Sequence, residues 1–211
     1  SKGSGYANAG ISCFSNISNY EWAGMIGKID QINGVGANEE GTAIDHGPDG
    51  SVYVLGEYSD TMEFDGNGPI APVNQIENYD IFLAKYDSLG TCLWAFGIGG
   101  PLADQAMDLV VDDNGFAYII GQFIDSMDLD PSSSQAMAYD GGFGYSSFLA
   151  KYTPDGEYTW SAVPEGPVRM NRLALSGNEN IVVAGDFQNT VDFDHSSGVN
   201  SISSNGGFDS Y

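Results

Sequence analysis

Apolar residues gather in short runs along this chain, and turn-forming residues separate the runs. The stretch 107–162 shows the pattern best, with MDLVV before DDNG, then FAYIIGQF, then SFLAKY before TPDG, and finally YTWSA. Asp-Gly and Asn-Gly pairs are typical of tight turns between antiparallel strands, and they occur at 49–50, 114–115 and 155–156. Because helical periodicity is hard to find, the pattern predicts consecutive antiparallel strands.

Both faces of the predicted strands are apolar. Successive side chains of a strand point to opposite sides, so in SVYVLGEY Val52 and Val54 lie on one face while Tyr53 and Leu55 lie on the other. A sheet with one face in water would alternate polar and apolar residues instead. We therefore expect each sheet to be covered on both faces.

The strand pattern recurs along the chain. FLAKYDSLGTCLWAFGIGG and FLAKYTPDGEYTWSAVPEG are close copies of one segment, and CFSNISNYEWA is a more distant one. Their tryptophans are Trp22, Trp94 and Trp160. A second segment recurs with nearly the same period around Gly56, Gly121 and Gly185. A period of this kind over a whole chain is typical of a repeat architecture.

Small four-stranded sheets stacked face to face on their own copies are the blades of a β-propeller. We predict an all-β fold in which residues 1–211 form one propeller segment. Its approximate units are 1–35 (partial blade), 36–100, 101–166 and 167–211 (partial blade). Half a blade, two whole blades and another half make about three blade equivalents, whereas closed propellers have about four to eight. The segment is therefore expected to be part of a larger ring, or to pair its open strand edges with another copy.

Several motifs resemble those of a known family. DDNGFAYIIGQF, VDFD, GGFD and FLAKYDSLGTCLWAFGIGG are similar to the units of a bacterial β-propeller repeat family found in secreted and cell-surface proteins. The third repeat departs from the pattern, since SGNEN replaces the Asn-Gly turn and Val182 stands where Tyr53 and Tyr118 stood. The resemblance implies an extracellular or cell-surface, noncatalytic module for binding, adhesion or scaffolding.

Charge limits the partners of the protein. The chain has 29 Asp and Glu residues against 6 Lys and Arg residues, a formal net charge of -23. Long-range attraction to nucleic-acid phosphates or anionic lipids is therefore excluded, and cations, basic proteins or glycans are left as partners. No apolar stretch approaches the roughly 20 residues of a membrane span.

Oxygen-bearing side chains occupy every second position after the second strand of each unit. They are Glu63, Asp65, Asn67, Asp128, Asp130, Ser132, Asp192, Asp194 and Ser196. Calcium prefers several hard oxygen ligands, so a D-x-D-x-S/N run that curls is a candidate calcium site. In the alternative interpretation, Met62, Met127 and Val191 face inward and the acids are the solvated side of a strand end with Asx turns. Both interpretations are open at this point.

The remaining chemistry favours no enzyme. His46 and His195 are isolated, and the H-E-x-x-H and G-x-S-x-G motifs are missing from the sequence. The tryptophans favour packing between blades, with a carbohydrate-binding or carbohydrate-active rim as the alternative. Cys13 and Cys92 form either a bridge or two free thiols.

Overall fold

The computed structural model describes residues 9–16, 19–26, 39–64, 68–70, 78–177, 180–194 and 198–211. All regular structure in these ranges is β-strand, which confirms the predicted all-β fold class. The described part of the chain contains no helix of the length and apolar character that a membrane crossing requires.

Two complete blades lie in the middle of the chain, each a sheet of four antiparallel strands. The first blade consists of β3 (Glu39–His46), β4 (Val52–Tyr58), β7 (Asp80–Tyr86) and β8 (Cys92–Ile98), in that order. The second blade consists of β9 (Gln105–Val111), β10 (Ala117–Phe123), β13 (Ser146–Tyr152) and β14 (Tyr158–Ala162), in that order. The predicted turns join β3 to β4, β9 to β10 and β13 to β14.

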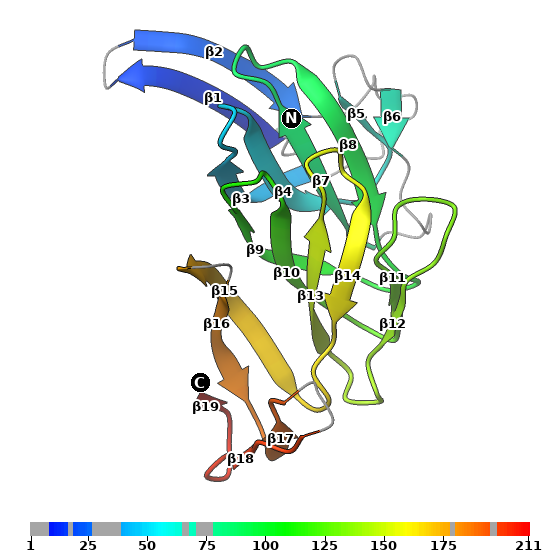
Figure 1. Ribbon diagram of the computed structural model, residues 1–211. Helices are drawn as coiled ribbons and strands as arrows, with labels where there is room; N and C mark the ends of the chain where they lie inside the picture. The colour runs from blue at the N-terminus through cyan, green and yellow to red at the C-terminus, as the bar shows by residue number, and fades with distance from the viewer. Residues whose placement is uncertain are drawn as a thin grey trace, which may run out of the picture.

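Partial blades flank the two complete ones. The N-terminal partial blade is the hairpin of β1 (Ala9–Asn16) and β2 (Asn19–Ile26). The C-terminal partial blade contains β15 (Val168–Ser176), β16 (Asn180–Phe187) and the short β19 (Asp209–Ser210). Figure 1 shows these sheets in succession, with the first strands β3, β9 and β15 in contact from one blade to the next.

Each unit also contains a short hairpin between its second and third blade strands, which the sequence did not predict. These hairpins are β5 (Met62–Phe64) with β6 (Gly68–Ile70), β11 (Ser126–Asp128) with β12 (Met137–Tyr139), and β17 (Thr190–Asp192) with β18 (Ser201–Ser203). The β11 hairpin reaches the preceding blade, because Asp128 N donates a 3.1 Å hydrogen bond to the Gly99 carbonyl. A Cβ atom at Gly100 would collide with the Ser126 carbonyl, so the Gly-Gly pair that closes the first blade makes room for this hairpin.

The two faces of β4 lie in different hydrophobic cores, as the sequence predicted. Tyr53 and Leu55 pack in the core between the first and second blades. Val54 and Tyr58 pack on the opposite face, in a core that includes Ile11 of the N-terminal hairpin. Neighbouring blades therefore supply each other's interior.

The repeated glycines lie where the first two strands of a blade lose their regular register. The pairing of β9 with β10 shifts between Ile120 and Gly121. A Cβ atom at Gly121 would lie 2.5 Å from the Gln105 carbonyl oxygen and 2.6 Å from Cε1 of Phe148. Only glycine allows this close approach, which explains its recurrence at the centre of the second strand.

Candidate functional site

The proposed calcium ligands of the second blade begin at the last residue of β11, Asp128, and continue into the loop before β12. Oδ1 of Asp128 accepts hydrogen bonds from the backbone amides of Asp130 (3.1 Å) and Ala136 (2.9 Å). Oδ1 of Asp130 accepts one from the amide of Ser132 (2.9 Å). These are Asx turns, and the neighbouring Met127 is fully buried, as the solvated-strand interpretation expects.

The C-terminal partial blade repeats this arrangement. Oδ1 of Asp192 accepts hydrogen bonds from the amides of Asp194 (3.0 Å) and Asn200 (2.8 Å), and Val191 is buried. Across the described ranges, no three His, Cys, Asp or Glu side chains are placed to hold a metal ion together. The Glu63 side chain and the residues Asp65, Asn67 and Ser196 lie outside what the structure describes.

The first and second blades are joined by side chains that bond to backbone turns. The Tyr53 hydroxyl donates a 2.8 Å hydrogen bond to the Gly115 carbonyl. Trp94 Nε1 and Lys85 Nζ both donate to the Pro154 carbonyl, at 3.0 Å and 3.3 Å. Trp94 therefore contributes to packing between blades, as the sequence favoured, while the Trp22 side chain lies outside the described residues.

The lysine of each LAKY segment lies over a tyrosine ring of its own blade. Lys85 is buried, its Nζ lies 5.1 Å from the centre of the Tyr53 ring, and it forms a 3.4 Å ion pair with Asp49. Hydrogen bonds from the Ser51 hydroxyl and amide, and then the Lys85 charge, lower the pKa of Asp49 to about 2. In the second blade, Lys151 Nζ lies 4.7 Å from the centre of the Tyr118 ring. The lysines therefore support equivalent tyrosines in the two blades.

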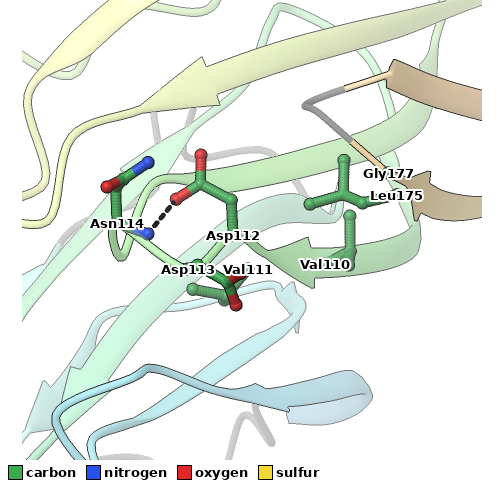
Figure 2. Close-up of a pocket in the computed structure, with 7 residues that line it drawn as sticks. All are labelled: Val110, Val111, Asp112, Asp113, Asn114, Leu175 and Gly177. Atoms are coloured by element: carbon green, nitrogen blue, oxygen red, sulfur yellow. Dashed lines mark hydrogen bonds between the residues drawn. The ribbon is translucent and has the colours of Figure 1, made fainter.

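The Asp-Asp-Asn-Gly stretch forms the turn that the sequence predicted. Oδ1 of Asp112 accepts hydrogen bonds from the amides of Asn114 and Phe116, both at 2.9 Å, and Oδ2 accepts one from the Tyr118 hydroxyl at 3.1 Å. Figure 2 shows the turn at the edge of a shallow hollow shared with Leu175 of β15. Both carboxylate oxygens are thus used to build the turn.

A second groove lies between the outer strands of the two complete blades. Trp94 and Phe96 of β8 form one wall, with ring centres 5.6 Å apart and planes 13° apart. The groove has a volume of about 430 Å³. Its other lining residues include Asp130, Pro131 and Ser132 of the β11 hairpin, Asp155, Gly156 and Glu157 of the turn before β14, and Tyr158 at the start of β14. The structure thus brings two of the proposed calcium ligands to a tryptophan, a combination that the sequence did not predict.

A buried carboxyl group, that of Asp104, is a further feature that sequence analysis missed. Asp104 is fully buried, and its Oδ2 accepts a 2.8 Å hydrogen bond from the Gly100 amide. Burial, together with the charges of Asp80 and Glu57, raises the pKa of Asp104 to about 8 against the lowering effect of the Gly100 amide. No local pattern marks Asp104, because its burial depends on the chain returning from the end of the first blade.

Of the remaining candidates, the structure describes the side chains of His46 and Cys92. His46 is exposed at the end of β3, and His195 lies outside the described residues. Cys92 is buried, and its Sγ donates to the Trp94 carbonyl oxygen at 3.4 Å. The Cys13 side chain lies outside the described residues, so the bridge and the two free thiols both stay predictions.

Comparison with known proteins supports a β-propeller-like repeat. No protein-family model matches the chain. An uncharacterized WD repeat-containing protein of Acanthamoeba polyphaga mimivirus is 30% identical over 135 residues, or 59% of this chain and 10% of the relative. The chain thus spans about a tenth of that relative's length. WD repeats form propeller blades, so this similarity agrees with the observed sheets, but it does not establish the bacterial family that the motifs resemble.

Proposed function

We propose that the chain is a noncatalytic segment of a β-propeller that serves as a binding, adhesion or scaffold module in a secreted or surface-attached protein. The observation that carries this proposal is the repetition of polar contacts. Asp128 and Asp192 each accept two backbone hydrogen bonds that close the same loop. Lys85 and Lys151 each lie over a tyrosine of their own blade. A single catalytic centre would require one unit to differ from the others in its polar residues. These aspartates and lysines instead make the same structural contacts in the two units where each is described.

A hydrolase screen tests the noncatalytic part of the proposal. The purified chain is incubated with chromogenic glycosides, esters and peptides, and we expect no turnover above the buffer rate. Turnover that is lost on substitution of a specific Asp or Glu would contradict the proposal. If the substrate were a glycoside, such a result would indicate a catalytic pair of carboxylates.

Carbohydrate binding is the second candidate function. It is favoured by the Trp94 and Phe96 rings, which are only partly buried and line a groove. Aromatic side chains of this kind can pack against the apolar face of a sugar ring. A glycan array tests this candidate, and the Phe96→Ala variant is the control, because bound glycan should be lost with the second ring.

Self-association through strand edges is a third candidate. Within the described residues, β19 pairs only with the end of β16, at Asp186 and Phe187. The outer edge of β16 over 180–184 therefore resembles the unpaired edges through which sheets associate. Light scattering of the purified chain decides this candidate, and a stable monomer would exclude it.

A further inference from the structure

We propose that the groove between β8 and β14 binds an arginine side chain presented by a partner protein. This inference rests on the proposed binding role, and it assigns a ligand chemistry to a groove that the fold alone does not require.

The first argument is the aromatic wall. Trp94 and Phe96 are two residues apart on one strand, so their side chains share a face, and their rings lie nearly parallel. Phe96 also packs on Tyr152 with ring centres 5.0 Å apart, which fixes its position from the second blade. A planar guanidinium can lie flat against an aromatic ring, a geometry that the ammonium of lysine lacks.

The second argument is charge. Asp130, Asp155 and Glu157 line the groove, and the last two are exposed. Among the described residues, no Lys, Arg or His side chain forms an ion pair with any of the three. With a formal net charge of -23 on the whole chain, the groove attracts a cation.

The third argument concerns hydrogen-bonding capacity. Trp94 Nε1 already donates to the Pro154 carbonyl, and the Tyr158 hydroxyl is bonded to Ser161 Oγ at 2.9 Å. The groove therefore offers mainly carboxylate acceptors to a ligand. Guanidinium has five donors and no acceptor, which matches this surface, while a sugar presents donors and acceptors in similar numbers.

The second blade does not repeat the pair of rings found in the first. Phe96 pairs with Leu83 in the first blade, and the corresponding partner of Leu149 in the second blade is Ala162. The second blade therefore keeps the tryptophan, at Trp160, without the second ring. Phe96→Ala consequently introduces the residue that the neighbouring repeat itself carries.

The experiment is a titration of the isotope-labelled chain, followed by amide chemical shifts, with the peptide acetyl-Gly-Gly-Arg-Gly-Gly-amide. The control peptide replaces arginine by citrulline, which keeps the shape and removes the charge. We expect saturable shifts at Gly156 and Glu157 with the arginine peptide, weaker binding at higher salt, and at least about tenfold weaker binding of the citrulline peptide. Equal binding of the two peptides, or shifts confined to other regions, would overturn the proposal.

Two double variants separate this groove from general charge attraction. Asp155→Asn with Glu157→Gln should weaken arginine binding by about tenfold. Asp113→Asn with Glu165→Gln removes the same charge from exposed positions outside the groove and should change binding by less than about twofold. Equal losses in both variants would overturn the proposal, as would binding that survives Phe96→Ala. Glycan binding that requires Phe96 but neither carboxylate would assign the groove to a sugar, and a positive hydrolase screen would separately reject the noncatalytic role.

Discussion

The hydroxyl of Tyr53, on the second strand of the first blade, donates a 2.8 Å hydrogen bond to the carbonyl of Gly115, in a turn of the second blade. Tyr53 is fully buried and its ring meets Trp94 edge to face, with centres 5.8 Å apart. A single side chain thus belongs to the core of one blade and to the backbone of the next. Because of this contact, we expect the two blades to unfold together.

Removal of that hydroxyl is the first test. Tyr53→Phe leaves a buried carbonyl without its donor, so we expect the free energy of unfolding to fall by about 1–2 kcal/mol. Denaturant unfolding followed by circular dichroism measures this loss. Tyr158→Phe is the matched control, since its hydroxyl bond to Ser161 is only partly buried and water can replace it. Similar losses in the two variants would contradict the role given to Tyr53.

The repeated glycine provides the second test. A Cβ atom at Gly56 would lie 2.5 Å from Cε1 of Phe82 and collide with the Glu40 carbonyl, whereas a Cβ atom at Gly41 would meet nothing within 4 Å. We expect Gly56→Ala to lower the free energy of unfolding by about 2–3 kcal/mol through overpacking, and Gly41→Ala to change it by less than about 1 kcal/mol. Thermal and denaturant unfolding of both variants check this difference. A tolerant Gly56→Ala variant would show that the second strand can shift away from its neighbours.

The blades could be predicted from the sequence because their determinants are local. The unbroken apolar run around Tyr53 specifies a strand with two covered faces, and the Asn-Gly pair at Gly115 specifies a turn, each from residues that are neighbours in the chain. The short hairpins could not be predicted in this way. The β11 hairpin is held partly by the bond from Asp128 to Gly99, which joins two blades and leaves no periodic pattern.

The outer groove was beyond prediction for the same reason. The sequence favoured packing of Trp94 between blades, which agrees with the structure, and for Asp130 it left a calcium ligand and an Asx turn open. Their approach to Glu157 depends on how the second blade seats on the first. Such placement is a tertiary property, which the spacing of residues along the chain does not encode.

The buried Asp104 makes stability depend on pH. Its pKa rises from the ordinary 3.8 to about 8 in the folded protein, so the folded state holds this proton more tightly than the unfolded chain does. The contribution of Asp104 to stability is therefore fully present below about pH 4, and it is lost as the pH rises through about 8. Unfolding of the wild type and of Asp104→Asn across pH 5–9 measures this effect.

We expect the stability of Asp104→Asn to decline less toward alkaline pH than that of the wild type. The asparagine side chain stays neutral at every pH, and its oxygen can still accept the hydrogen bond from the Gly100 backbone amide. Asp113→Asn is the control, since Asp113 is exposed in the turn before β10. Parallel pH profiles for wild type and Asp104→Asn would show that Asp104 is ionised in the folded protein.

The loop aspartates allow backbone capping to be separated from calcium binding. Asp128→Ala removes the acceptor of two backbone amides and should lower the free energy of unfolding by about 1–2 kcal/mol, whereas Asp128→Asn keeps an acceptor oxygen and should retain most of the stability.

The response to divalent cations is a separate test of the same loop. Oδ1 of Asp128 and Oδ1 of Asp130 both already accept hydrogen bonds from the loop. We therefore expect calcium and magnesium at equal concentration to raise the melting temperature equally, because both screen the net charge of -23. Thermal melts of wild type and Asp128→Asn with calcium, magnesium and chelator check this expectation. A rise that only calcium produces, and that Asp128→Asn abolishes, would instead identify the loop as a calcium site, because loss of the carboxylate charge weakens a hard cation far more than it weakens a hydrogen bond from a backbone amide.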